Sequence, residues 1–255
     1  MNYSWTQVIG GEFLSKPVLS SYGFIGATDG KNIVSISNNG IQVWELNINV
    51  NKNSIINVIS EDFTLCTTNN NRKITLINPS GVPLWNKVLD FEITSPVLEG
   101  RDGRFFMKGT NQIICFGING ICKWLIETET LSDLPIQEME DGSLIVFLKK
   151  LENGKTKALR ITPYGEIIED ITFSGEILTA ATASDGIFLT FSDGSAGLFG
   201  LSQEKSVNKA VIDKKIYNSN TQNFFCGDKD FESAYFITDK SDGIVLFSVD
   251  SKNGN

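Results

Sequence analysis

Several acidic and nucleophilic residues stand at spacings that could support chemistry. The densest group is the segment 228–232, where three carboxylates alternate along the chain as Asp228, Asp230 and Glu232. Carboxylate oxygens are ligands that calcium prefers, but the segment lacks the glycine and the distal glutamate of a calcium-binding loop. We interpret it as a solvated acidic turn, so these three residues are only weak metal candidates. We expect no cofactor.

Other catalytic patterns lack the setting that they need. Ser202 and Lys205 have the Ser-x-x-Lys spacing of some acyl transferases, without the companion motifs of those enzymes. The glycine-rich segment 194–200 has no helix after it to form a phosphate loop. The chain has no histidine, which excludes Ser-His and Cys-His catalysis and histidine-ligated zinc. We therefore expect a protein that is not an enzyme.

Paired carboxylates could serve a glycosidase. However, the repeated acids Asp62, Asp102, Asp141 and Asp185 occupy one equivalent turn, between the first and second strands of each predicted repeat. Asp in a tight turn has a sufficient structural reason, because its side chain bonds the turn backbone. We interpret these acids as turn residues.

The cysteines lie in or beside apolar, strand-like runs, at positions 66, 115, 122 and 226. We expect buried free thiols rather than disulfides. A hairpin that turns at Asn119-Gly120 would set Cys115 opposite Trp124 and Cys122 opposite Gly117, so the nearest pair would not face each other.

Four tryptophans mark an internal repeat. Trp5, Trp44, Trp85 and Trp124 are 39, 41 and 39 residues apart, and in the last three a glycine stands four residues before the ring. An apolar run precedes each glycine, which predicts a hairpin with a residue of positive φ in its turn. Two further strands upstream of each hairpin give four antiparallel strands in about forty residues, which is a β-propeller blade.

The repeat predicts an all-β fold, a six-bladed β-propeller that forms a single domain over residues 1–255. The later repeats keep the same spacing of strands and turns but have no tryptophan. Glu169 stands at the tryptophan position of the fourth repeat. The last repeat supplies three strands, and residues 2–9 would complete it by pairing with residues 244–250. Segment 202–217 is interpreted as a strand, although a helix fits its pattern too. The predicted blades are 14–50, 55–90, 94–130, 134–173, 176–213, and 221–250 with 2–9.

The stretches from Asp29-Gly30 to Trp44 and from Thr110-Asn111 to Trp124 resemble the repeat of quinoprotein-type (PQQ-like) β-propellers. The resemblance implies that the recurrent ring docks between neighbouring blades, so the structural residues would be Trp5, Trp44, Trp85 and Trp124. Members that bind the quinone have eight blades and adjacent cysteines, which this chain lacks. The resemblance is therefore closest to the non-catalytic BamB-like scaffold members, which bind proteins but have eight blades and a lipidated export signal.

A propeller scaffold binds partners through its loops, because loops on a rigid frame are free to vary. We expect a protein or peptide partner on the face made by the loops between second and third strands and between blades. The alternative is a carbohydrate-binding or carbohydrate-active propeller with a site over the central channel. The candidate residues of the partner-binding face are Asp29, Lys31, Asn32, Asn70, Arg72, Lys108, Asn111, Lys149, Asp193, Asp239 and Asp242.

The net charge and the hydropathy of the chain restrict the kinds of partner that we expect. The net charge of −8 disfavours nucleic acid, and no apolar run is long enough to span a membrane. The first residues have no export-signal pattern, which predicts the cytoplasm, or the cell envelope if a leader has been removed. Residues 127–176 hold 11 acids and 5 bases, and form either a solubilising face or a docking face for a basic partner. The acids at the entry to the fourth blade are Glu127, Glu129, Asp133, Glu138, Glu140 and Asp141.

Overall fold

The computed structural model describes residues 5–14, 16–149, 151–152, 154–183, 186–193, 196–200, 224–227, 233–240 and 243–250. In this part of the chain one 3-10 turn, Ser60–Asp62, accompanies strands that pair only in antiparallel fashion. The chain divides into two compact units, an N-terminal unit of residues 1–127 and a C-terminal unit of residues 128–255. The described residues include no helix long and apolar enough to cross a membrane.

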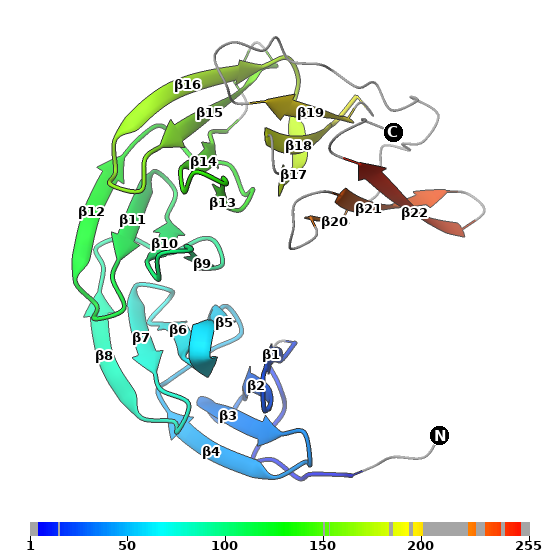
Figure 1. Cartoon of the computed structure of the whole chain (residues 1–255). Helices are drawn as coiled ribbons and strands as arrows, with labels where there is room; N and C mark the ends of the chain where they lie inside the picture. Colours follow the sequence, from blue (N-terminus) through cyan, green and yellow to red (C-terminus); the bar gives the residue numbers. More distant parts are fainter. Residues whose placement is uncertain are drawn as a thin grey trace. The chain divides into compact units, whose positions relative to one another are not determined.

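The N-terminal unit consists of three four-stranded sheets, each a meander in chain order. Sheet 1 contains β1 (Val18–Ser20), β2 (Gly23–Ala27), β3 (Asn32–Ser37) and β4 (Gln42–Asn47). Sheet 2 contains β5 (Ile56–Val58), β6 (Thr64–Thr68), β7 (Lys73–Ile77) and β8 (Pro83–Val88). Sheet 3 contains β9 (Leu98–Glu99), β10 (Phe105–Lys108), β11 (Gln112–Phe116) and β12 (Cys122–Glu127). The first strands of the three sheets lie on one side of this unit and the fourth strands on the other (Figure 1).

The C-terminal unit continues the same pattern. Sheet 4 contains β13 (Gln137–Glu138), β14 (Leu144–Phe147), β15 (Thr156–Ile161) and β16 (Ile167–Phe173). Sheet 5 contains β17 (Ile177–Ala183), β18 (Gly186–Phe191) and β19 (Ala196–Gly200). Sheet 6 contains β20 (Phe224–Gly227), β21 (Ser233–Lys240) and β22 (Gly243–Asp250).

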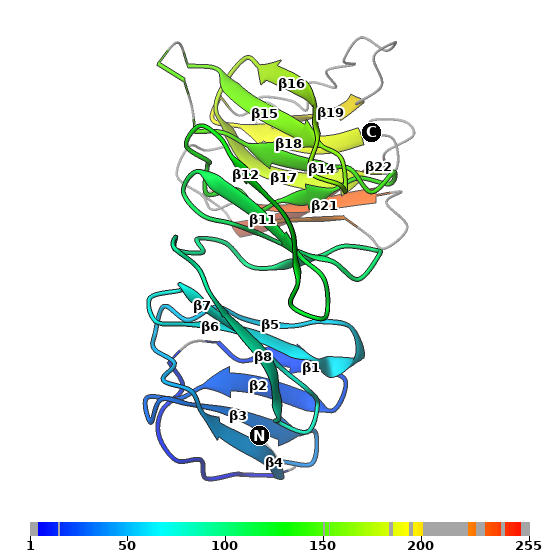
Figure 2. The ribbon, with the colours of Figure 1, turned by 90° about the vertical axis from the view of Figure 1, so that its left-hand side faces the viewer.

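The core lies between stacked sheets, and the second and third strands supply most of it. Figure 2 shows sheets 1 and 2 lying one over the other in the N-terminal unit. All residues of β6, β10 and β14 are buried, whereas the fourth strand β4 alternates between half-buried and exposed residues. Burial on both faces explains why the middle strands read as continuous apolar runs in the sequence.

The hairpin between the third and fourth strands has the same geometry in sheets 1, 2 and 3. Gly40, Gly81 and Gly120 have φ of 75°, 82° and 73°, in the region that glycine adopts without strain. Each hairpin also carries a register shift next to the turn. The shift is the bulge that accompanies a three-residue hairpin loop.

Because of this bulge, one observed residue pair differs from the predicted pair. Cys115 lies opposite Trp124, as predicted, but Cys122 lies opposite Phe116 and not opposite Gly117. The prediction assumed a two-residue turn, and the extra residue of the bulged loop moves the partner by one position.

The tryptophan rings join neighbouring sheets of the N-terminal unit. The indole Nε1 of Trp44 donates to the carbonyl of Pro79 at 2.9 Å, and that of Trp85 donates to the carbonyl of Ile118 at 2.7 Å. A Cβ at Gly81 would meet the Trp44 ring at 2.6 Å, and one at Gly120 would meet the Trp85 ring at 2.7 Å. Each ring therefore lies directly on the turn glycine of the next sheet.

The first and last of the four rings have other surroundings. Trp5 contacts the turn of sheet 1 itself, where its Nε1 donates to the carbonyl of Asn38 at 2.7 Å and its ring covers Gly40. Trp124 packs against Phe106 of its own sheet, with ring centroids 5.8 Å apart.

Closure by the N-terminal segment is not confirmed. Residues 5–9 belong to no strand, and sheet 6 has three strands in the part of the chain that the structure describes. The six-bladed ring and the single domain therefore stay predictions. Segment 202–217 and the acids Asp228, Asp230 and Glu232 lie outside the described residues, as do Asp185 and Asp242.

We expect Trp85→Ala to lower the free energy of unfolding by about 3–5 kcal/mol, because the ring fills the gap between two sheets and its hydrogen bond is lost. Urea denaturation followed by circular dichroism measures the change. Leu84→Ala is the matched control, since Leu84 is the neighbouring residue on β8 and is 51% exposed. A Trp85→Ala variant no less stable than Leu84→Ala would contradict the spacer role.

Candidate binding site

The residues predicted for the binding face lie at one end of the sheets of the N-terminal unit. Asp29 and Lys31 are in the β2–β3 turn, Asn70 and Arg72 in the β6–β7 turn, and Asn111 in the β10–β11 turn. All five are exposed. The connections that leave the fourth strands pass beside these turns: the amide of Ile48 donates to the carbonyl of Lys31, and that of Leu89 to the carbonyl of Arg72. Turns and connections therefore form one end of this unit.

Some of the predicted residues also hold the loops in place. The carboxylate of Asp29 accepts the amide of Glu12 at 2.9 Å, and the guanidinium of Arg72 donates to the carbonyl of Asp90 at 2.7 Å. Asn32 is half-buried and donates to the carboxylate of Glu45.

Lys108 is a correction to the predicted face, because it is only 1% exposed. The connection after β8 covers the end of β10, where the amide of Thr94 donates to the carbonyl of Lys108 at 2.9 Å. The turn position alone could not show this cover, which comes from residues further back in the sequence.

Three predicted residues lie in the C-terminal unit with a defined backbone position. Lys149 follows β14 and Asp193 follows β18, and both are exposed. Asp239 lies on β21, next to the β21–β22 turn. Lys149 also lines a cavity.

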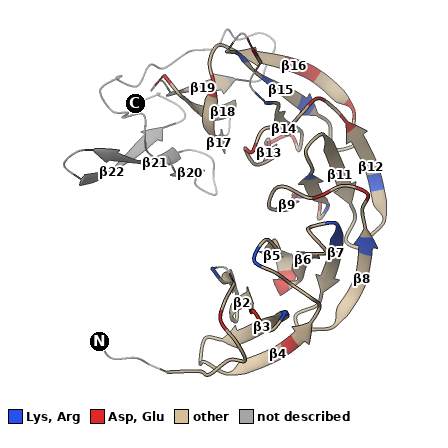
Figure 3. Cartoon of the chain, turned by 180° about the vertical axis from the view of Figure 1, so that it is seen from behind, with Lys and Arg blue, Asp and Glu red and all other residues tan. Residues whose placement is uncertain are grey.

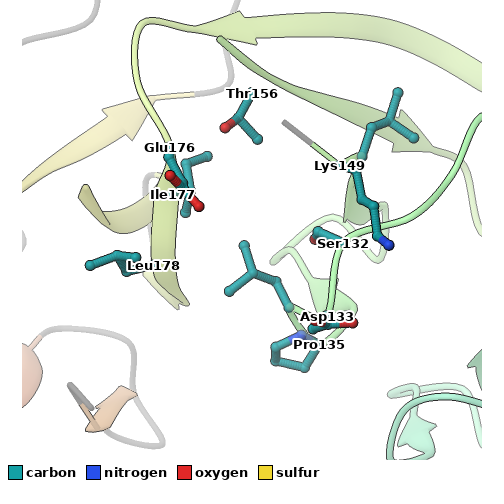
Figure 4. A pocket seen from close by; sticks show the side chains of 10 residues that line it. Ser132, Asp133, Pro135, Lys149, Thr156, Glu176, Ile177 and Leu178 are labelled. Carbon is teal, nitrogen blue, oxygen red and sulfur yellow. The ribbon is translucent and has the colours of Figure 1, made fainter. Parts of the chain in front are cut away.

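This cavity has a volume of about 520 Å³ and lies where sheets 4 and 5 meet at their loop ends. Figure 4 shows side chains from three separate segments around it. The lining residues are Ser132, Asp133, Leu134, Pro135, Leu148, Lys149, Thr156, Glu176, Ile177 and Leu178.

Backbone hydrogen bonds fix the three segments. The amide of Ser132 donates to the carbonyl of Phe147, and the amide of Lys149 donates to the carbonyl of Thr130, so segment 130–132 runs beside the end of β14. On the other side, the hydroxyl of Thr156 donates to the carbonyl of Gly175 at 2.8 Å. The walls are therefore held without a ligand.

The lining combines an apolar floor with three charged side chains, those of Asp133, Lys149 and Glu176. Leu148 and Ile177 are 2% and 7% exposed, whereas Leu178 is 42% exposed at the cavity. The ammonium group of Lys149 and the carboxylate of Asp133 are both exposed, and neither forms an ion pair or side-chain hydrogen bond with another described residue. Such a lining can bury an apolar side chain and orient it with charges of both signs.

Among these residues, sequence reasoning singled out Lys149 for the partner-binding face and Asp133 for the acidic region. The others come from the connection before β13, the end of β14, the start of β15 and the start of β17, which meet only when sheets 4 and 5 pack together. The apolar Leu134-Pro135 pair before β13 and the Ile177-Leu178 pair at the start of β17 were the available signal.

The acids of the turns between first and second strands are engaged locally. Asp62 accepts the amide and the hydroxyl of Ser21, from the neighbouring sheet. Asp102 forms an ion pair with Arg104, and Asp141 bonds Ser143 and forms an ion pair with Arg160. The described residues contain no group of three Asp, Glu, Cys or His that could hold a metal ion.

Two of these contacts lower the pKa of the acid concerned. The hydrogen bond from the Arg104 side chain lowers the pKa of Asp102. Partial burial opposes ionisation of Asp141, but hydrogen bonds from Ser143 and Arg160 outweigh it and lower the pKa of Asp141. Both acids are therefore ionised partners in the fold and not proton donors near neutral pH.

The acids of residues 127–176 do not gather on one face of sheet 4. Asp133 precedes β13 and Asp141 follows it. On β15 and β16, Arg160 pairs with Glu169 at 3.6 Å and Lys157 pairs with Asp170 at 2.8 Å. Figure 3 accordingly shows blue positions on β15 and red positions on β16. Pairing on the strands leaves Asp133 as the free acid at the cavity.

The cysteines divide into two groups. Cys66 and Cys115 are buried, which raises the pKa of Cys66 to about 12 and that of Cys115 to about 11. Cys122 is exposed, which corrects the expectation of a buried thiol, because the fourth strands alternate between covered and open positions. Cys66, Cys115 and Cys122 are free thiols.

The comparisons with known proteins support the fold. No family profile and no curated protein matches the sequence. Among solved structures, BamB from Moraxella catarrhalis matches with a TM-score of 0.64 and 16% identity, over 96% of this chain and 72% of that one. The fold is that of a PQQ-like β-propeller. The resemblance seen in the repeats is thus confirmed.

Other PQQ-like neighbours differ in activity. Virginiamycin B lyase from Staphylococcus aureus matches with a TM-score of 0.60 and 16% identity, over 92% of this chain and 83% of that one. A quinoprotein alcohol dehydrogenase-like protein from Bacteroides thetaiotaomicron matches with a TM-score of 0.57 and 11% identity, over 92% of this chain and 65% of that one. The fold therefore occurs in proteins with different activities, and function has to be argued from the site.

We expect a thiol reagent at pH 8 to label Cys122 in the native protein and to leave Cys66 and Cys115 unlabelled. A thiolate is the reacting form, and burial keeps the two inner thiols protonated. Partial burial also raises the pKa of Cys122, so its labelling is slower than that of free cysteine and accelerates as the pH rises. Mass spectrometry of the Cys226→Ala variant measures the labelled sites, and guanidinium chloride exposes all three. Native labelling of Cys66 at the rate of Cys122 would contradict the burial.

Proposed function

We propose that this protein is a non-catalytic β-propeller scaffold that binds an extended segment of a partner protein at the cavity of the C-terminal unit. The observation that carries the proposal is the exposed Leu178 beside two free charges, Asp133 and Lys149, on walls held by backbone bonds. A partner can therefore bury an apolar side chain against the lining and form polar contacts with the two charged side chains.

The apolar part supplies affinity. Leu178 and Pro135 form the open part of the lining, and Ile177 lies beneath them. One leucine-sized side chain buried there contributes about 1.5–3 kcal/mol. An extended segment places alternate side chains on one face, so the next side chain along that face reaches the rim.

The charges supply orientation. The carboxylate of Asp133 accepts a hydrogen bond from a basic side chain, while the ammonium group of Lys149 donates to a carbonyl or carboxylate oxygen. A net charge of −8 favours encounter with a basic partner and disfavours nucleic acid. We therefore propose a segment with one large apolar and one basic residue.

A scaffold is favoured over an enzyme by the absence of histidine and by the local engagement of Asp62, Asp102 and Asp141. The likeness to BamB supports this choice at the level of fold. The lyase neighbour shares the fold to a similar degree, so the fold alone does not decide between them.

Selection from a random heptapeptide phage library, followed by fluorescence polarisation of the selected peptides, tests the proposal. We expect enrichment of peptides with an apolar and a basic residue, and at least a tenfold loss of affinity in Leu178→Asp. Ile168→Asp is the matched control, because Ile168 is 51% exposed on β16 and does not line the cavity. We expect its affinity to stay within twofold of the wild type.

Selected peptides that bind Leu178→Asp as tightly as the wild type would place the site elsewhere, and a library without any enriched peptide would contradict peptide binding. Asp133→Asn separates the two contributions, since it keeps the apolar contact and removes the charge. We expect it to weaken peptides with a basic residue and to spare variants of them in which that residue is norleucine.

We also propose that the propeller has six blades and that residues 2–9 complete sheet 6 by pairing with β22. Without that strand, β22 presents unpaired backbone groups that promote aggregation. Deletion of residues 1–9 is therefore expected to give aggregates in size-exclusion chromatography, whereas Trp5→Ala, which keeps the strand, stays monodisperse. A monodisperse deletion variant with an unchanged melting temperature would contradict closure.

A further inference from the structure

A second, smaller pocket lies between sheets 1 and 2, within the N-terminal unit. Its volume is about 200 Å³. It lies at the end of these sheets that carries the β1–β2, β3–β4, β5–β6 and β7–β8 turns, opposite the β2–β3 and β6–β7 turns. The lining residues are Ser20, Tyr22, Ile25, Ser35, Ser37, Val43, Trp44, Asp62 and Pro79.

The pocket exists because one repeat departs from its neighbours. Ser35 pairs with Trp44 across the hairpin, and the residues in the same register are Leu76, opposite Trp85, and Cys115, opposite Trp124. Both of those side chains are fully buried and fill their positions. A serine in place of a leucine leaves space, and it turns a hydroxyl group toward that space.

Three hydroxyl groups of the lining have no partner within the protein. Ser35 is 8% exposed, and it forms no hydrogen bond through its side chain with any described residue. The hydroxyl groups of Ser20 and Tyr22 likewise have no partner in the described part of the chain. Tyr22 is 68% exposed, so water reaches the pocket in the free protein, and a ligand that both donates and accepts hydrogen bonds can take the place of that water.

The remaining walls are rigid. The indole of Trp44 is fixed by its bond to the carbonyl of Pro79 and by its contact with Gly81. Ser21 holds both carboxylate oxygens of Asp62, which leaves a lone pair on each for a ligand. Ile25 and Val43 complete an apolar side beside the ring.

We propose that this pocket binds a single sugar ring. A sugar has groups that both donate and accept, as the three serine and tyrosine hydroxyl groups do, and its C–H face suits the indole, Ile25 and Val43. An alkylammonium ion would suit Asp62 and the aromatic ring. It offers no acceptor, however, so the hydroxyl hydrogen of Ser35 would stay unpaired at a cost in affinity.

Saturation-transfer NMR with D-glucose, D-galactose, D-mannose and N-acetyl-D-glucosamine tests the proposal, with tetramethylammonium as the competing probe. We expect transfer to the ring protons of at least one sugar, at least a fivefold loss of affinity in Ser35→Ala, and no transfer in Ser35→Leu. The leucine variant restores the residue type that sheet 2 carries in the same register, so the fold accommodates it, and thermal denaturation verifies this.

Tyr22→Phe and Tyr164→Phe form a matched pair, because both tyrosines are exposed turn residues and only Tyr22 lines the pocket. We expect the first to weaken sugar binding and the second to leave it unchanged. The absence of transfer to all four sugars, transfer that persists in Ser35→Leu, or Ser35-dependent binding of tetramethylammonium alone would each overturn the proposal. Leu178→Asp should leave the sugar signal intact, so the outcome is independent of the peptide site.

Discussion

The arrangement of the sheets depends on the close approach of an indole ring to a turn glycine of the next sheet. Trp44 and Trp85 each need a neighbour without a Cβ, and Gly81 and Gly120 meet that need while their positive φ closes the hairpin turn. One residue type thus satisfies two constraints at the same position. Because the ring also donates a hydrogen bond to the same turn, its orientation is fixed as well as its depth. The pocket beside Trp44 and the stacking of sheets 1 and 2 both follow from this junction.

The repeat made the fold predictable, because strands, turns and rings recur at a fixed spacing. The predictions that proved wrong concern the pairing or the exposure of single residues. The bulge moved the partner of Cys122 from Gly117 to Phe116, and nothing in the local sequence distinguishes a two-residue turn from a bulged one there. The burial of Lys108 depends on the connection after β8, which belongs to another part of the repeat, and the exposure of Cys122 depends on which positions of the fourth strand are covered.

The candidate sites were less predictable than the fold, for a physical reason. A cavity forms where segments distant in sequence fail to fill the space between them, so its lining has no local signature. Lys149 was found because it follows a predicted strand and Asp133 because it belongs to an acidic stretch, whereas Leu178 became relevant only once sheets 4 and 5 were packed together. Ser35 could have been noticed from the sequence, since the aligned repeats place leucine and cysteine at its position. Departures from a repeat are therefore better guides to a site than the repeat itself.

The junctions between sheets also have a direction. Sheets 1 and 2 each give a ring to the next sheet, and sheets 2 and 3 each give a glycine to the sheet before, so sheet 2 carries two complementary half-junctions. Removing or duplicating the whole of this repeat would therefore regenerate a junction of the same kind at the point of the cut. Changing part of a repeat separates a ring from its glycine. A chain built in this way can gain or lose length in whole modules without redesign of its interfaces, which explains how a single repeat pattern supports propellers of different sizes.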